Sequence, residues 1–303
     1  MLDYAALRAV TAVAQTGSFE KAAQQLSVTP SAVSQRVKQF EERLGVALIA
    51  RGQPCTATEQ GDWLCRHMER VGMLEGELFA RMPGLGRQAE HQPVTLHIAT
   101  NADSLATWFL DGVTAYAKTS EHLLNIAVED QDHTAEWLAK GKVVAAVTSL
   151  GMPAPGCRRI ELGVLRYRAT ASPDFATRYF PRGVTLQGLR IAPALVFNQK
   201  DRLQAAWIER VLGRSTAHPS HWLPSSQSFV DAALAGMGWG MNPEQLVADH
   251  LKAGRLVELA PESAIDVSLN WQVSKLSADA VSDLTRAIVL AARAKLRPHG
   301  ARA

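Results

Sequence analysis

Residues 18–45 constrain the fold more than any other stretch, because their pattern predicts two short helices joined by a turn. The first helix has apolar residues at i, i+3, i+4 and i+7, which form one helical face: Phe19, Ala22, Ala23 and Leu26. Ser18 is suited to cap this helix, and Thr29 followed by Pro30 predicts the start of the second. Gly45 is expected to end the second helix as a left-handed residue.

The polar face of the second helix carries short hydrogen-bonding groups near its start and cations further along. Ser and Gln donate and accept at base edges, whereas Arg and Lys neutralise phosphates. Arg51 follows an apolar run and is expected in a wing that reaches the DNA backbone or minor groove. An ordinary pair of surface helices is the alternative, and the order of helix, turn, helix and wing disfavours it. The predicted DNA contacts are Ser18, Thr29, Pro30, Ser31, Ser34, Gln35, Arg36, Lys38 and Arg51.

The same segment resembles the winged helix-turn-helix of LysR-type transcriptional regulators. The residues that carry the resemblance are Ala22-Ala23, Ser31, Ser34, Val37, Phe40-Glu41, Leu44-Gly45, Leu48, Arg51 and Thr58-Glu59-x-Gly61. One departure is Pro30, which stands where members of the family often carry glutamine and has no side-chain donor. The resemblance implies double-stranded DNA as a partner.

Composition supports a soluble globular protein of two or three domains, with 303 residues, 47% hydrophobic and 20% charged. The net charge of only +3 argues against a nonspecific nucleic-acid coat. No apolar run is long enough to span a membrane and no leader pattern opens the chain, so a cytoplasmic protein without membrane contact is expected. The three cysteines lack a Cys-x-x-Cys spacing, so we expect no disulfide, metal site or cofactor.

A single long helix is predicted over residues 58–82, where apolar residues recur at steps of three or four: Leu64, Met68, Val71, Leu74, Leu78 and Met82. Such a stripe must be buried against a partner, and the family resemblance implies the same helix of a second chain. Packing on its own chain is the alternative. The Pro- and Gly-rich residues 83–86 end the helix, and the segment up to Pro93 is expected to be a hinge.

From Val94 onward the pattern changes to strands that alternate with helices, which predicts parallel sheets with crossover helices. Residues 265–273 are expected to return to the first lobe as a strand, and a helix over 278–296 closes it. Two lobes joined by crossing strands resemble the sensor domain of the LysR family, which is of the periplasmic-binding-protein type.

The expected architecture is an α+β multidomain protein with an N-terminal winged helix-turn-helix, a long linker helix and a C-terminal two-lobed α/β sensor domain. The expected boundaries are 1–58 for DNA binding, 59–92 for the dimerisation helix and hinge, and 93–303 for the effector domain. Within the last, lobe I takes 93–152 and 266–303, and lobe II takes 153–265.

Ligands of open α/β sheets lie beyond the carboxyl ends of the strands, and polar residues follow several predicted strands here. Hydroxyl and N–H groups that hold an anion, beside acidic residues, suit a zwitterion with an extra cation, such as a basic amino acid. Alternatively these residues are helix caps and solvated acids. The predicted effector site comprises Asn101, Asp103, Ser104, Glu129, Asp130, Thr148 and Ser226.

The sensor domain also resembles the ArgP/LysG branch of the family. The matching segments are Asn101–Trp108, Val128–Asp130, Arg178–Pro181, Gly183–Thr185, Ser225–Ser226 and Phe229–Val230. The branch implies lysine or arginine as the effector and activation of a basic amino-acid exporter gene. It also implies that Ser104 lies near the effector carboxylate, with Glu129 or Asp130 near its ammonium or guanidinium group.

An enzyme is not expected. The Gly236-Met-Gly238-Trp-Gly240 segment lacks the third glycine of a nucleotide-binding loop, and no nucleophile elbow, zinc-protease motif or P-loop occurs. We therefore predict a sequence-specific transcriptional regulator that acts as a homodimer or homotetramer, with RNA polymerase as a further partner. The alternatives are a LysR-type regulator of a different small metabolite and, more remotely, a cytoplasmic amino-acid-binding protein without a DNA role.

Overall fold

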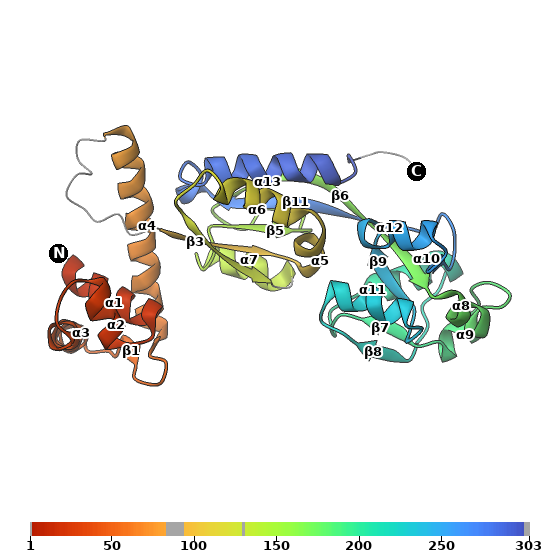
Figure 1. The fold of residues 1–303 in the computed structure, drawn as a ribbon, viewed down its shortest axis with the longest axis horizontal. Coiled ribbons are helices and arrows are strands. Elements are labelled where there is room, and N and C mark those ends of the chain that lie inside the picture. Colours follow the sequence, from red (N-terminus) through yellow and green to blue (C-terminus); the bar gives the residue numbers. More distant parts are fainter. Residues whose placement is uncertain (1, 83–93, 129–130, 300–303) are drawn as a thin grey trace. The chain divides into compact units, whose positions relative to one another are not determined.

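The computed structural model describes residues 2–82, 94–128 and 131–299 (Figure 1). The chain divides into two compact units, one formed by residues 1–95 with 121–123 and the other by 96–120 with 124–303. Among the described residues, no helix combines the length and apolar character that a membrane span requires.

The first unit is a small helical domain with a two-stranded wing. Its elements are α1 (Tyr4–Thr16), α2 (Phe19–Gln25), α3 (Pro30–Leu44), β1 (Ile49–Ala50), β2 (Thr56–Ala57) and α4 (Glu59–Arg81). The core is formed by fully buried residues of α1 and α3, with Leu48 from the wing and Cys65 from α4. Burial raises the pKa of the Cys65 thiol to about 11, which keeps it protonated and unreactive at neutral pH. We did not predict α1, although it supplies six of the fourteen buried residues of this core.

The predicted helix ends are confirmed. Thr29 Oγ1 accepts a hydrogen bond from the Ala32 amide at 3.2 Å, and Pro30 occupies the first turn of α3. Gly45 follows α3 with φ +69°, a conformation that favours glycine. Ser18 caps α2 by accepting from the Glu20 amide at 3.2 Å. These contacts fix where the turn between α2 and α3 begins and ends.

The wing is joined closely to the start of α4. Thr58 Oγ1 accepts from the Gly61 amide at 3.1 Å and donates to the Ala47 carbonyl at 2.8 Å. A Cβ on Gly61 would lie 2.0 Å from the Leu48 carbonyl oxygen. From the other side, Glu41 Oε1 accepts from the Leu48 amide at 2.7 Å. The strand that leads into the wing is therefore held between α3 and α4.

The second unit is built on a seven-stranded sheet whose order is β10-β6-β11-β5-β3-β4, with β9 paired to β6. Its first lobe contains β3 (Thr95–Thr100), α5 (Ala102–Ser104), a π-helix (Leu105–Phe109), α6 (Leu110–Ala117), β4 (Leu123–Val128), α7 (Gln131–Ala139), β5 (Ala145–Thr148) and α13 (Ser282–Lys295). Figure 1 shows α6 and α13 on one face of this sheet and α7 on the other. Two long strands, β6 (Cys157–Ala171) and β11 (Ile265–Ser274), pair antiparallel and connect the two lobes.

The second lobe contains α8 (Pro173–Tyr179), α9 (Leu186–Ile191), β7 (Ala194–Val196), α10 (Leu203–Leu212), β8 (Ser220–Trp222), α11 (Ser226–Leu234), β9 (Gly240–Pro243), α12 (Glu244–Lys252) and β10 (Val257–Glu258). The prediction of parallel sheets was only partly right. β3 pairs parallel with β5, and β7 with β8, but the pairs of β6 with β9, β10 and β11 are antiparallel. The reason is that the connecting strands run through the sheet in opposite directions.

A cluster of ion pairs lies where the two lobes meet, at the first residue of α12. Glu244 Oε1 accepts from Arg168 on β6 at 2.5 Å, and Glu244 Oε2 accepts from Arg297 after α13 at 2.8 Å. Arg168 also donates to Glu258 on β10 at 2.5 Å. Burial raises the pKa of Glu244, but the hydrogen bonds from both arginines lower it by more, so the pKa lies below its usual value. One carboxylate thus links both lobes to the connecting strand.

Replacing Glu244 with alanine is expected to destabilise the second unit by about 2 kcal/mol, because it leaves two partly buried guanidinium groups short of a partner. The contribution should be present above the usual glutamate pKa and be lost as pH falls through the lowered one. Urea unfolding at neutral and acidic pH measures this. Asp249→Ala on the same helix removes a fully exposed pair with Lys252 and should change little. Equal losses from both variants would contradict the expectation.

Candidate functional site

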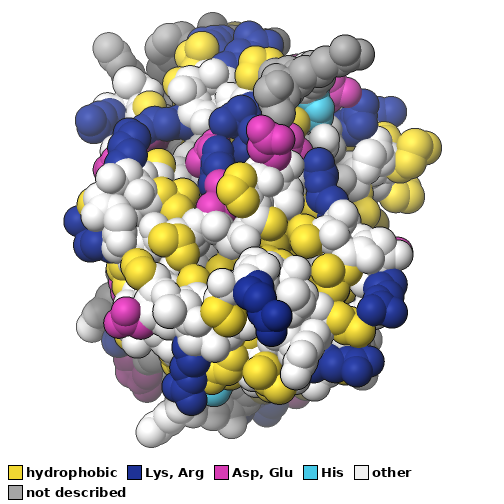
Figure 2. Space-filling model, turned by 90° about the vertical axis from the view of Figure 1, so that its right-hand side faces the viewer, with side chains coloured by type: hydrophobic (Ala, Val, Ile, Leu, Met, Phe, Trp, Pro, Cys, Tyr) yellow, Lys and Arg dark blue, Asp and Glu magenta, His cyan; other side chains and the backbone are white. Residues whose placement is uncertain are grey.

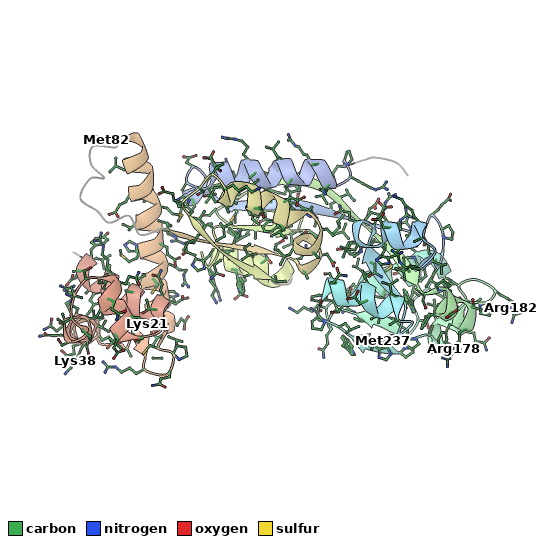
Figure 3. All side chains as sticks on the ribbon, viewed as in Figure 1. Lys21, Lys38, Met82, Arg178, Arg182 and Met237 are labelled. Atoms are coloured by element: carbon green, nitrogen blue, oxygen red, sulfur yellow. The ribbon has the colours of Figure 1, made fainter. Side chains whose placement is uncertain are left out.

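The exposed face of α3 is the first candidate site. Ser31, Gln35, Arg36 and Lys38 are exposed, and Ser34 is half-buried. Figure 3 shows that Lys38 points away from the body of the first unit. Among the described residues, the ion pair of Lys38 is a long, exposed contact of 3.7 Å with Glu42, so its charge remains available. The face therefore offers hydrogen-bonding groups and cations to a partner, as the sequence predicted.

Other residues of the predicted DNA-contacting set have structural roles. The hydroxyl groups of Ser18 and Thr29 cap α2 and α3, and Thr29 Oγ1 lies 3.0 Å from Ser31 Oγ. Pro30 is exposed at the first turn of α3. Arg51 Cζ lies 5.5 Å from the centroid of the Phe19 ring, at the start of α2. These residues frame the α3 face, and their contacts with DNA stay predictions.

Replacing Gln35 with alanine is expected to reduce discrimination between target and mismatched duplexes by about 1–3 kcal/mol for each base edge that the side chain no longer reads. Lys38→Ala should instead weaken binding to all duplexes alike and lower the salt dependence, because it removes a cation that neutralises a phosphate. Titrations of labelled target and scrambled duplexes at several salt concentrations distinguish the two effects. If the Gln35→Ala protein lost affinity equally for target and scrambled duplexes, Gln35 would position the protein on the DNA and not recognise bases.

The second candidate site lies between the lobes and is centred on Asp103. Asp103 lies in the short helix α5, directly after β3, where the sequence predicted the end of a strand. Its Oδ1 accepts from Ser226 Oγ of lobe II at 2.6 Å, and its Oδ2 accepts from Tyr167 Oη of β6 at 2.7 Å. One carboxylate of the first lobe is therefore held by hydroxyl groups of the second lobe and the connecting strand.

The electrostatics of this interlobe site are acidic. Burial raises the pKa of Asp103, the hydrogen bonds from Ser226 and Tyr167 oppose the shift, and the charge of Asp201 adds to it. Burial together with the charge of Asp103 also raises the pKa of Tyr167 well above its usual value. Asp201 Oδ2 accepts from the Phe197 amide at 3.0 Å. Neither Asp103 nor Asp201 forms an ion pair with a described lysine or arginine, so a cation would be favoured here.

The remaining predicted effector residues differ in their surroundings. Asn101 Oδ1 accepts from the Ser104 amide at 2.7 Å, so Asn101 caps α5. Thr148 is buried at the end of β5, and its hydroxyl oxygen accepts from the Leu150 amide at 3.0 Å. Ser104 is fully buried, and its Oγ has no hydrogen-bond partner among the described residues. Glu129 and Asp130 lie outside the described residues.

The sequence reasoning missed Tyr167 and Asp201. Tyr167 lies between Arg166 and Arg168 on β6 and is 4% exposed, and a buried tyrosine hydroxyl usually has a hydrogen-bond partner. Asp201 gave no comparable signal, because an acid before α10 is expected simply to cap it, and its Oδ1 does accept from the Leu203 amide. Residues 2–82, 94–128 and 131–299 contain no cluster of His, Cys, Asp or Glu with the geometry of a metal site.

Comparison with known proteins matches both halves of the chain. A family model described as a bacterial regulatory helix-turn-helix protein of the lysR family matches residues 4–62, and the LysR substrate binding domain matches residues 90–292. The regulator LysG of Mycobacterium tuberculosis is 40% identical over 96% of this chain and 94% of its own. ArgP of Pseudomonas aeruginosa is 40% identical over 94% of both. The structure of full-length LysG from Corynebacterium glutamicum with bound effector Arg is 35% identical, covers 98% of this chain and all of that one, and has a TM-score of 0.65.

Proposed function

The chain belongs to the LysR family of DNA-binding transcriptional regulators with an effector-binding domain, and from this premise we propose that its effector is lysine or arginine. The observation that supports this proposal best is the acidic centre of the cleft, where Asp103 and Asp201 have no described cationic partner. The C. glutamicum relative has arginine bound, which is consistent with the same effector class.

Two groups of the cleft match the two ends of a basic amino acid. Asp103 would bind the side-chain ammonium or guanidinium group, since a desolvated carboxylate gains most from a charge-assisted hydrogen bond. Ser104 would donate its unpartnered hydroxyl to the α-carboxylate. Glu129 and Asp130 remain proposed contacts on the strength of the family resemblance. Each ligand group thus has a named residue that can be changed.

The proposed assembly is a homodimer formed through α4, or a homotetramer built from two such dimers. Large exposed apolar side chains on α4 and at its end fall within about 100° of arc on one helical face: Trp63, Leu74, Leu78 and Met82. A second α4 would bury them and place two α3 helices in successive major grooves.

We also propose that the regulator acts in the cytoplasm with RNA polymerase at a basic amino-acid exporter gene. We propose the same domain boundaries as the sequence predicts, after residues 58 and 92, and the same boundaries between the two lobes, after residues 152 and 265.

Calorimetric titration of the full-length protein with lysine, arginine, citrulline and norleucine tests the effector class. Lysine or arginine should bind, whereas the two neutral analogues of similar size should not. Footprinting on the exporter promoter with and without the better ligand then tests regulation. If none of the four bound while another metabolite altered the footprint, the chain would be a LysR-type regulator of a different effector.

Effector affinity is expected to fall as pH falls, because the cation binds the ionised form of Asp103. The pKa of Asp103 is raised from its ordinary value of about 3.9, so the loss should begin at a higher pH than for a solvated aspartate. Binding the cation would release a proton from the protonated fraction, and titrations in buffers of different ionisation enthalpy measure that release. If effector affinity stayed constant from pH 8 down to the lowest pH at which the protein is folded, a group other than Asp103 would bind the cation.

A further inference from the structure

A hollow of about 930 Å³ lies within lobe II. It is open to solvent on one side and is lined by α8, by Pro193 before β7, by His221 of β8, and by the carboxyl ends of α11 and α12 with the residues that follow them. The lining residues that bear on its chemistry are Phe175, Arg178, Tyr179, His221, Met237 and Arg255. None of these residues belongs to the acidic cleft around Asp103. The hollow is therefore a separate feature of the same lobe.

The charges around this hollow are mainly cationic. Arg178 Cζ lies 5.0 Å from the centroid of the Tyr179 ring, which orients the guanidinium group, and its N–H groups make no hydrogen bond to a described residue. Arg255 donates through Nε to His250 Nδ1 at 3.1 Å, so its two terminal nitrogens remain available. Neither arginine forms an ion pair with a described carboxylate, although one exposed acid, Asp174, also lines the hollow. A planar guanidinium group without a carboxylate partner is suited to bind the carboxylate of a ligand.

One wall of the hollow is aromatic, although polar groups make up more of its exposed lining than apolar groups do. Phe175 is 4% exposed, and its ring centroid lies 4.5 Å from that of Tyr179, so the two rings form one continuous surface. Met237 is 42% exposed at the rim, and a flexible thioether of this kind adapts to flat ligands. Figure 3 shows Met237 and Arg178 near one another at this end of lobe II. Figure 2, which looks onto this end, shows apolar side chains with lysines and arginines set among them.

We propose that this hollow is a second ligand site that binds a small carboxylic acid with an aromatic or aliphatic body. Arg178 and Arg255 bind the carboxylate, and Phe175, Tyr179 and Met237 contact the body. The site is chemically opposite to the acidic cleft, because it selects an anion where the cleft selects a cation.

The two sites are connected by one helix. Ser226, which contacts Asp103, begins α11, and Leu234 at the other end of α11 lines the hollow. Nine residues of α-helix span about 13 Å, so a ligand in the hollow would contact the same rigid element that carries the cleft residue. The carboxylic acid can alter the response to the effector only if it binds the effector-free and effector-bound conformations of the sensor domain with different affinities.

Phenylacetate is a suitable probe, with 2-phenylethanol as the uncharged analogue of the same shape. Calorimetric titration of the full-length protein should show phenylacetate binding, both alone and with the cleft saturated by arginine, and no binding of 2-phenylethanol. The Arg178→Ala/Arg255→Ala protein should bind phenylacetate at least about tenfold more weakly, since it cannot form the charge-assisted hydrogen bonds to the carboxylate. Met237→Trp, which fills the rim, should also weaken binding.

Arg182→Ala is the matched control, because Arg182 is exposed at the same end of lobe II but does not line the hollow. It should bind phenylacetate like the unaltered protein. Unchanged thermal unfolding of all variants would show that the lobe remains folded. The proposal is overturned if phenylacetate does not bind, if 2-phenylethanol binds equally well, or if the double variant retains full affinity.

Discussion

Replacing Gly61 with alanine is expected to destabilise the DNA-binding unit by about 3 kcal/mol and to abolish binding to target DNA. A Cβ at this position would lie 2.0 Å from the Leu48 carbonyl oxygen, and 2.9 Å from the Leu48 carbonyl carbon. Both are backbone atoms of the wing, so neither can move aside as a side-chain tip would. The start of α4 and the wing would have to separate, which also breaks the hydrogen bond from the Thr58 amide to the Leu48 carbonyl.

Gly76→Ala on the same helix provides the control, because a Cβ there meets nothing within 4 Å. It should stabilise α4 by roughly 0.5–1 kcal/mol, the usual gain in helix propensity. Thermal unfolding of the two variants, with electrophoretic mobility shifts on one duplex, gives the comparison. If the Gly61→Ala protein unfolded at the same temperature as the Gly76→Ala protein, the close approach at Leu48 would not be a constraint.

Local chemistry explains why the N-terminal unit was largely predictable. The caps at Ser18 and Thr29 and the left-handed Gly45 each depend on residues no more than a few positions apart. The constraint on Gly61 does not, because it arises only when the wing folds back over α4. The LysR-type motif includes both Gly61 and Glu41. The sequence alone does not indicate why position 61 must be glycine, or that the Glu41 carboxylate accepts a hydrogen bond from the backbone next to the wing.

The sensor domain was less predictable, since its site depends on contacts distant in sequence. Asp103 and Ser226 were both proposed as cleft residues from their places at strand and helix ends, but their direct hydrogen bond joins positions 123 residues apart. Tyr167 lies 64 residues from Asp103, and no local pattern relates the two. The antiparallel course of β6 and β11 was missed for the same reason, because strand direction is set by the tertiary path of the chain.

Replacing Asp103 with asparagine is expected to weaken lysine or arginine binding by about tenfold to a hundredfold, corresponding to the loss of a charged hydrogen bond of about 1.5–3 kcal/mol. Asparagine has the same shape, and its amide can still hydrogen-bond to the Ser226 and Tyr167 hydroxyl groups that contact Asp103. What it lacks is the negative charge that a cationic ligand requires. Basal DNA binding should be preserved, because the first unit is untouched.

The stability of this variant separates a binding defect from a folding defect. The raised pKa of Asp103 means that its ionised form opposes folding, so this penalty is present once pH exceeds the raised pKa and absent at low pH. The Asp103→Asn protein should therefore be at least as stable as the unaltered protein at neutral pH.

Asp111→Asn, on the exposed face of α6 near Lys295, is the matched control and should leave both affinity and stability unchanged. Calorimetric titration with arginine and thermal unfolding at pH 7.5 measure both quantities. Full affinity in the Asp103→Asn protein would show that the effector cation is bound by a different acid, and the same titrations on Asp201→Asn and Asp130→Asn would identify it.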